Sequence, residues 1–213
     1  MRIWTLLTIT TITIGLGAQT VVPVGPFDSV ELHDGGHVVV RPGATRRVTI
    51  LRDDAGAARI AVRGQRLVIH NAPGKHRRHE RLEIEVVIPE LAAVSVSNGG
   101  TVQTAGAFAA RPAIAASVAQ GGTIDIRSVA ADAVVAAVDS GGRIFTSPRH
   151  TLTASVRSGG VITYWGTPHV TRSVRDGGVV VKGAPGKADR PLSELDPGLP
   201  VIPRVPPAIV TPR

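Results

Sequence analysis

Three groups of residues have types and spacings that could support binding or catalysis. The first is a basic run, Lys75-His76-Arg77-Arg78-His79-Glu80-Arg81, and the second is His33-Asp34-Gly35-Gly36-His37. The third comprises acids and serines beside glycine doublets, as in Asp139-Ser140-Gly141-Gly142. The basic run could bind a polyanion, the paired histidines a metal ion, and the acids and serines could serve as catalytic carboxylates or nucleophiles.

The formal net charge of +8 belongs to one segment of the 213-residue chain. Residues 41–81 hold eleven Arg and Lys against Asp53, Asp54 and Glu80, and the remainder holds thirteen of each sign. A localised positive surface attracts phosphate, sulfate or carboxylate polymers. We therefore expect polyanion binding by six basic residues: Lys75, Arg77, Arg78, Arg81, Arg46 and Arg47. The alternative is a solvated charged loop that keeps this segment soluble.

The expected partners are an anionic polysaccharide, lipopolysaccharide or another component of the cell envelope. The chain has two Trp, one Tyr and three Phe, which leaves little for base stacking, and we expect no specific nucleic-acid binding. It has no Cys, which excludes zinc-thiolate sites, iron–sulfur clusters and a cysteine nucleophile.

Metal binding and catalysis have weaker support in the pattern. The glycines between His33 and His37 are explained as a corner of the chain, so we expect no metal ion there. Ser140 and Ser158 have no His at the same corner. Asp139, with Arg157 and Arg175 further along, is better explained as an exposed ladder of charges worth about 0–1 kcal/mol. We expect no cofactor and no catalytic residue, and the alternative is a carbohydrate-active enzyme, either a polysaccharide lyase or a hydrolase.

The first 19 residues have the pattern of a secretory signal peptide. Arg2 precedes an apolar and Thr-rich stretch over residues 3–16, and small residues follow it. Fourteen residues span roughly 21 Å as a helix, less than the roughly 30 Å hydrocarbon core. We expect cleavage between Gly17 and Thr20, no transmembrane span in the mature protein, and a location in the periplasm, on the cell surface or in the medium. The alternative is an uncleaved membrane anchor.

Glycine doublets form the most regular pattern in the chain. They occur at 35–36, 99–100, 121–122, 141–142, 159–160 and 177–178. An aliphatic residue stands three positions before each doublet and another two positions after it. Glycine permits positive φ and close backbone approach, so we expect the doublets to form corners. The expected corner residues are Gly99, Gly100, Gly121, Gly122, Gly141, Gly142, Gly159, Gly160, Gly177 and Gly178.

Apolar and polar residues alternate on both sides of the doublets, as in Thr123-Ile124-Asp125-Ile126. This pattern indicates short strands with one buried face. A period of 18–22 residues is about one coil of a β-solenoid, in which Val118, Val138 and Val156 would lie directly above one another. The alternative is an antiparallel sandwich in which the doublets are hairpin turns.

The rest of the chain differs from these repeats. Residues 20–90 are expected to cap the first coil with short strands, including a hairpin from residues 59–63 to 66–70 through a type II′ turn at Gly64-Gln65. Residues 91–183 are expected to form the coils, with Tyr164-Trp165 covering the end of the last one or contacting a sugar. Residues 184–213 hold eight prolines and are expected to be an extended or disordered tail.

These features resemble the GIN-domain family, the head domain of putative auto-transporter adhesins. The resemblance covers residues 27–183. It rests on Phe27-Asp28-Ser29-Val30, Leu67-Val68-Ile69, Pro89 with Leu91, Ser97-Asn98-Gly99-Gly100 and the similar later corners, and Tyr164-Trp165-Gly166-Thr167-Pro168. The usual corner of the family is Ser-Gly-Ser-Gly, which is polar-polar-Gly-Gly here. The resemblance implies a right-handed parallel β-helix on an exported bacterial envelope protein, and it supplies no catalytic residues.

Together these observations favour a non-enzymatic, exported envelope or surface protein that serves as an adhesin-like binding or structural module. A further possibility is a structural role in the envelope in which the proline-rich tail docks a partner.

Overall fold

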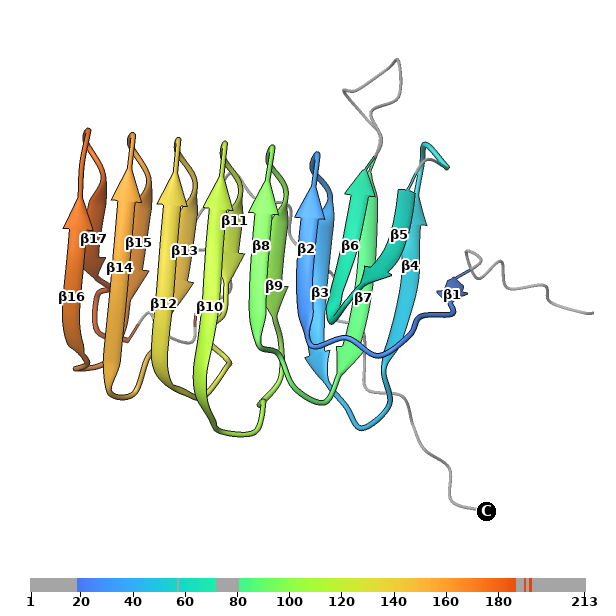
Figure 1. Cartoon of the computed structure of the whole chain (residues 1–213), viewed down its shortest axis with the longest axis horizontal. Coiled ribbons are helices and arrows are strands. Elements are labelled where there is room, and N and C mark those ends of the chain that lie inside the picture. The colour runs from blue at the N-terminus through green and yellow to red at the C-terminus, as the bar shows by residue number, and fades with distance from the viewer. Residues whose placement is uncertain (1–18, 57, 72–80, 187–189, 191, 193–213) are drawn as a thin grey trace, which may run out of the picture.

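The computed structural model describes residues 19–56, 58–71, 81–186, 190 and 192, which form two mixed β-sheets (Figure 1). Sheet A contains, in spatial order, β1 (Thr20–Val22), β4 (Arg47–Asp53), β7 (Leu82–Ile88), β3 (His37–Pro42), β9 (Thr101–Thr104), β11 (Thr123–Asp125), β13 (Arg143–Thr146), β15 (Val161–Tyr164) and β17 (Val179–Lys182). Sheet B contains β16 (His169–Val174), β14 (Thr151–Arg157), β12 (Ala131–Asp139), β10 (Arg111–Ala119), β8 (Ala93–Ser97), β2 (Ser29–His33), β6 (Arg66–Asn71) and β5 (Ala58–Arg63).

The expected all-β class is confirmed for these residues. The expected signal peptide lies outside them except for Gln19, as does most of the proline-rich tail. Within the part of the chain that the structure describes, no helix is long and apolar enough to span a bilayer.

From β8 onward the chain alternates between the two sheets, and every pairing in this region is parallel (Figure 1). The strands on either side of a glycine doublet therefore lie in different sheets and do not pair with each other. The antiparallel sandwich with hairpins at the doublets is wrong. A pair of successive strands, one from each sheet, is called a rung below.

The expected stacking of Val118, Val138 and Val156 is confirmed, because these three residues are direct partners in the ladder of sheet B and each is at most 2% exposed. The facing column in sheet A contains Ile124, Ile144 and Ile162, all fully buried. Alternation of side chains along each strand places these aliphatic residues between the two sheets. Full burial of such a side chain stabilises the fold by roughly 1.5–3 kcal/mol, so the core extends as a continuous strip along the stack.

The doublets lie at the corners, and each corner begins with a non-glycine residue in the left-handed region. Asn98, Gln120 and Ser140 have φ of 57–58°, followed by positive φ at both glycines of their doublets. The second glycine lies against the rung before it. A Cβ at Gly142 would be 2.5 Å from Val118 Cγ1, while a Cβ at Gly141 would meet nothing within 4 Å. The first glycine of the doublet is therefore needed for its backbone conformation. The second is needed for its conformation and also because a side chain there would collide with the preceding rung.

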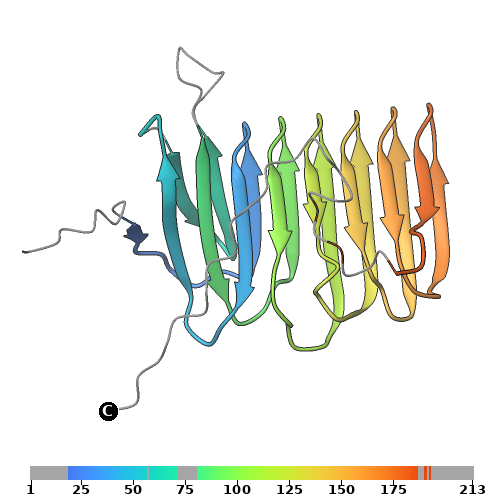
Figure 2. The same cartoon turned by 180° about the vertical axis from the view of Figure 1, so that it is seen from behind.

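The strands before β8 interrupt this order. β2 and β3 flank the first doublet and pair in parallel with β8 and β9, so they continue the same two columns through Leu32 and Val38. The chain then passes through β4 to β7 before returning to β8. β6 and β7 add to the parallel ladders, whereas β1, β4 and β5 pair antiparallel at this end. Figure 2 shows the same order from the side of sheet A.

The predicted hairpin is confirmed, since β5 and β6 pair antiparallel from Arg63 and Arg66 outward. Gly64 has φ of 61°, and Gln65 is absent from the residues with positive φ, as a type II′ turn requires.

Candidate functional site

Of the six basic residues predicted from the sequence, the structure describes Arg46, Arg47 and Arg81, and these three are not all close together. Lys75, Arg77 and Arg78 lie outside the described residues. Arg81 stands directly before β7, next to the pair formed by Asp53 and Leu82, whereas Arg47 opposes Val87 near the other end of the same ladder. At about 3.3 Å per residue, these two positions are separated by about 20 Å.

Arg46 and Arg47 are both exposed, and Arg46 Nε donates a hydrogen bond of 2.7 Å to the carbonyl oxygen of Phe27. Part of the Arg46 guanidinium is therefore occupied in holding the chain before β2. Arg47 is the residue of this pair that is freer to bind an anion.

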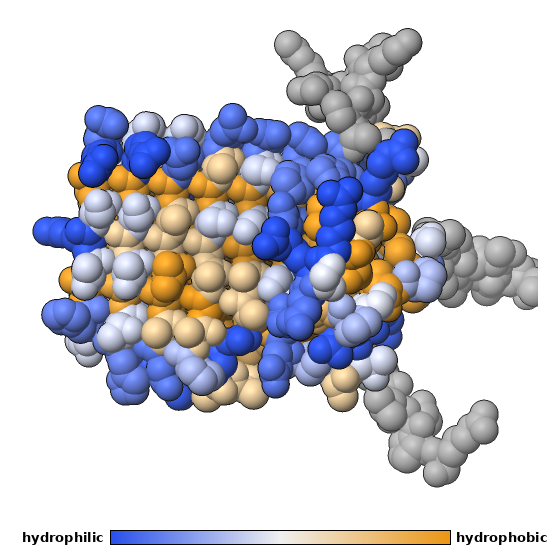
Figure 3. Space-filling model, in the orientation of Figure 1, coloured by the Kyte–Doolittle hydropathy of each residue, from blue (hydrophilic) through white to orange (hydrophobic). Residues whose placement is uncertain are grey.

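A second basic surface lies on the β5–β6 hairpin. Arg59, Arg63 and Arg66 are exposed on its outward face, while Ile60 and Val62 pack against the core. Arg66 Nη1 lies 3.0 Å from Glu31 Oε2. Arg59 and Arg63 have no ion pair with any residue in the described ranges. Figure 3 shows a band of hydrophilic residues near β2 and β6, with hydrophobic residues to its right toward β5, whereas the middle of the face over the later strands is mostly white to orange.

Sequence reasoning counted Arg59 and Arg63 in the basic segment but did not select them as binding residues. The available signal was the period of two in Arg59-Ile60-Ala61-Val62-Arg63, which places both arginines on the face opposite the buried aliphatic residues.

A chain of hydrogen bonds lies beside this hairpin on sheet B. Glu31 Oε1 is 2.7 Å from His33 Nε2, and His33 Nδ1 is 2.6 Å from Ser97 Oγ. Burial alone would raise the pKa of Glu31, but hydrogen bonds from His33 and Arg66 lower it overall. The serine contacts Nδ1 and the carboxylate Nε2, the reverse of the arrangement in serine proteases. This chain links β2 to β8.

His33 and His37 flank the same doublet but lie in different sheets, so they do not form one site. His33 stacks on His70 in sheet B, with ring centroids 4.4 Å apart. His37 belongs to sheet A, between Glu83 of β7 and Thr101 of β9. No group of three potential metal ligands is found among the residues that the structure covers.

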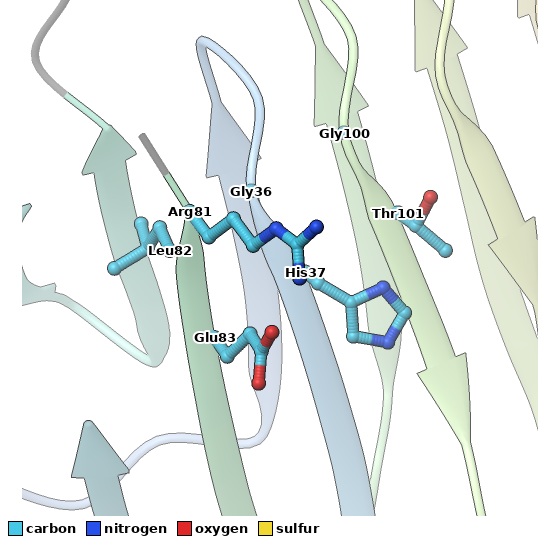
Figure 4. A pocket seen from close by; sticks show the side chains of 7 residues that line it. All are labelled: Gly36, His37, Arg81, Leu82, Glu83, Gly100 and Thr101. Carbon is cyan, nitrogen blue, oxygen red and sulfur yellow. The ribbon is translucent and has the colours of Figure 1, made fainter. Parts of the chain in front are cut away.

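His37 lines a pocket of about 280 Å³ on the outward side of sheet A (Figure 4). Its other lining residues are Gly36, Arg81, Leu82, Glu83, Gly100 and Thr101. The imidazole is only 9% exposed, and neither ring nitrogen has a hydrogen-bond partner among the described residues. Burial lowers the pKa of His37 to about 4, so the ring is neutral at pH 7 and can donate one hydrogen bond and accept another.

In Figure 4 the Arg81 side chain extends toward His37 from the neighbouring strand. The pocket thus combines a cation, a neutral imidazole and the Glu83 carboxylate, and this arrangement can hold a small polar group. Among the predicted basic residues that the structure describes, Arg81 lines this pocket.

Trp165 does not cover the last rung or face the solvent, contrary to the expectation. It is 6% exposed and packs with Phe145 and Leu192 on the outward side of sheet A. Its indole Nε1 donates a hydrogen bond of 3.2 Å to the carbonyl oxygen of Ala184. The Arg127 guanidinium lies 5.2 Å from its ring, so Trp165 belongs to a buried cluster that holds the chain after β17.

Comparison with known proteins gives a family for part of the chain. Residues 26–113 match the family model described as "Putative auto-transporter adhesin, head GIN domain". The resemblance identified from the sequence is therefore confirmed over these residues, which run from before β2 into β10. Among curated proteins, no sequence matches this chain significantly.

Several solved structures have a similar chain trace. A putative adhesin from Bacteroides fragilis has 16% identity and a TM-score of 0.48, with 78% of this chain and 95% of that chain covered. A putative adhesin from Parabacteroides merdae has 13% identity and a TM-score of 0.35, with coverage of 78% and 96%. A putative cell adhesion protein from Clostridium sporogenes has 8% identity and a TM-score of 0.35, with coverage of 78% and 98%.

Proposed function

We propose, from the match of residues 26–113 to the head GIN domain of putative auto-transporter adhesins, that this protein is a non-enzymatic binding module of the bacterial cell surface. It acts after export, in the periplasm, on the cell surface or in the medium. Its role is adhesin-like, and it holds an extended partner through the outward faces of its sheets.

We propose further that the two sheets are opposite walls of a right-handed β-solenoid. The alternation of successive strands between the sheets supports this proposal, as does the parallel register from rung to rung. In this scheme residues 20–90 include the capping strands, residues 91–183 form the later coils, and residues 184–213 form a tail.

The proposed ligand is a polyanion, either an anionic polysaccharide or lipopolysaccharide. The observation that carries this step is the hairpin surface, where Arg59 and Arg63 are exposed four residues apart on one face of β5 without an acidic partner in the described ranges. Cations placed in this way bind sulfate, phosphate or carboxylate groups by releasing their counterions.

The described carboxylates do not support the enzyme alternative. Asp139 lies in register with Arg157 at a corner of sheet B, where both side chains are exposed. A lyase or hydrolase needs a second carboxylate or a base positioned against the first. Turnover of an anionic polysaccharide that is lost on Asp139→Asn would favour the enzyme instead.

Retention of the mature protein on heparin and on immobilised lipopolysaccharide tests the proposal. We expect the triple variant Arg77→Glu, Arg78→Glu, Arg81→Glu to elute at clearly lower salt than the unchanged protein. The double variant Arg46→Glu, Arg47→Glu should shift less, because Arg46 is held by Phe27. If the triple variant elutes with the unchanged protein, the segment before β7 does not bind polyanions.

Export is tested by sequencing the N-terminus of the protein recovered from outside the cytoplasm. We expect the mature chain to start between residues 18 and 20. An intact Met1 on a membrane-bound protein would show that the leader is retained as an anchor.

A further inference from the structure

The stack ends at β16 and β17 on the side opposite the β5–β6 hairpin. Among the described residues, each of these strands has a partner on one side only (Figure 1). Val174, Val179 and Val181 are 41–44% exposed, and they are three of the five large apolar side chains that are exposed in the described part of the protein. The outer edges of both strands therefore combine unpaired backbone groups with apolar side chains, which is a template for a further strand.

One residue breaks the apolar pattern at this end. An inward column of sheet B contains Ala116, Ala136 and Ala154, each at most 2% exposed, and the next residue in register is Arg172. The neighbouring inward positions of β16 stay apolar, with Val170 after Leu152 and Val174 after Val156. The last rung thus presents Val170, Arg172 and Val174 to any strand that pairs with β16.

Arg172 decides which strands can dock. A neutral strand laid over β16 would remove water from the guanidinium and give it no partner, which is costly. A second copy stacked head to tail would be such a strand, because the inward residues of β5 at the opposite end are Ile60 and Val62. A carboxylate over Arg172 would instead form an ion pair with hydrogen bonds. The same end carries Arg175 and Lys182 against Asp176, so its charge also favours an acidic partner.

We propose that the β16–β17 end is a docking surface for an extended segment of another polypeptide. This segment adds a strand to β16, and it presents an Asp or Glu over Arg172 between apolar residues over Val170 and Val174. The backbone groups of the edge give the affinity, and the alternate side chains give the specificity. This surface lies at the opposite end of the stack from the basic hairpin, so the two proposals succeed or fail independently.

The direct test uses two labelled peptides that differ at one residue. Both contain a strand-forming core, Val-Thr-Glu-Thr-Val in one and Val-Thr-Lys-Thr-Val in the other. We expect fluorescence anisotropy with the full mature chain to show at least tenfold tighter binding of the Glu peptide. Arg172→Glu should reverse the preference, and Arg175→Glu, which makes the same charge change just after β16, should leave it in place.

A second measurement uses the protein alone. Arg172→Ala extends the alanine column to the last rung, and we expect this variant to self-associate in sedimentation velocity while the unchanged protein and Arg175→Ala do not. The proposal is overturned if neither peptide binds at about 1 mM, if the two bind equally, or if Arg172→Glu leaves their order unchanged. Self-association of the unchanged protein that Arg172→Ala does not increase would also overturn it.

Discussion

The two halves of the molecule contain the same type of glycine corner, but their outward faces carry different residues. In the half from β8 to β17, one outward column of sheet B consists of small residues, namely Ser95, Ser117, Ala137, Ser155 and Ser173. In the half from β1 to β7, the same column begins with Glu31, and the adjacent hairpin presents Arg59 and Arg63. Figure 3 shows this contrast along one face.

We propose from this difference that the regular half serves as a scaffold and that the interrupted half carries the binding residues. A ladder with one residue type per column leaves little room for clustered charges, because like charges would lie about 4.8 Å apart on successive strands. Where β4 to β7 break the ladder, residues from distant parts of the sequence come together, such as Arg41 and Glu85, which are 2.9 Å apart.

The largest expected effect lies in the regular half. Gly160→Ala would place a Cβ 2.2 Å from Val138 Cγ1, at a residue whose φ is not positive, so only the packing between rungs is disturbed. We expect the free energy of unfolding in urea to fall by about 3 kcal/mol. Gly159→Ala is the control, because it meets nothing within 4 Å and suffers only the strain of φ +85°, about 1 kcal/mol. Equal losses would show that the rungs are not closely packed at this corner.

The next effect lies in the interrupted half and depends on pH. Because burial lowers the pKa of His37 to about 4, the unfolded chain binds a proton between pH 6.5 and 4 that the folded protein does not bind. The free energy of unfolding should therefore decrease by up to about 3 kcal/mol as pH falls through this window, with no further loss from His37 below it.

Urea unfolding of His37→Asn between pH 7 and pH 4 should show a shallower pH dependence than the unchanged protein. His169→Asn, at an exposed position of β16, should keep the original slope. If His37→Asn keeps it too, the imidazole is solvated in the folded protein.

A smaller effect separates the middle of the stack from its end. Val138 is 2% exposed and Val174, two rungs further in the same column, is 41% exposed. We expect Val138→Ala to cost about 2 kcal/mol and Val174→Ala less than about 1 kcal/mol, because a cavity forms only where both neighbours remain. A similar loss at both positions would indicate that the last rung is covered.

The smallest expected effects compare two outward acids of sheet B. Asp139 has no salt bridge within the described part of the chain, and Asp139→Asn should change the free energy of unfolding by less than about 0.5 kcal/mol. Glu31 contacts both His33 and Arg66, and Glu31→Gln should cost about 1 kcal/mol. Thermal unfolding of the two variants would contradict the comparison if Asp139→Asn were the more damaging.

The regular half could be predicted from the sequence because each rung repeats the same constraints. Val118, Val138 and Val156 share one position relative to the glycines, and that position fixes both register and burial. The left-handed residue before each doublet was also visible in principle, because Asn98 and Asp176 are types that tolerate this conformation.

The interrupted half could not be predicted in the same way. Doublets 35–36 and 99–100 are 64 residues apart, and this spacing does not reveal that β2 and β8 are neighbours. The pocket at His37 lies in sheet A, where β3, which follows β2, pairs with β7 and with β9, which follows β8. Its walls come from these three strands and from the residues just before them. Leu192 packs against Trp165 as a single side chain from a proline-rich segment. Because that segment has no periodic pattern of apolar residues, its sequence does not predict this burial.

The central claim, that the interrupted half binds and the regular half supports it, is tested most directly by two charge-matched variants. Arg59→Glu with Arg63→Glu and Arg157→Glu with Arg175→Glu remove the same charge from opposite ends of the stack. Titration of heparin at two salt concentrations should show at least a tenfold loss of affinity for the first pair and less than a twofold loss for the second. Equal losses would contradict the claim, because net charge alone would then explain the binding.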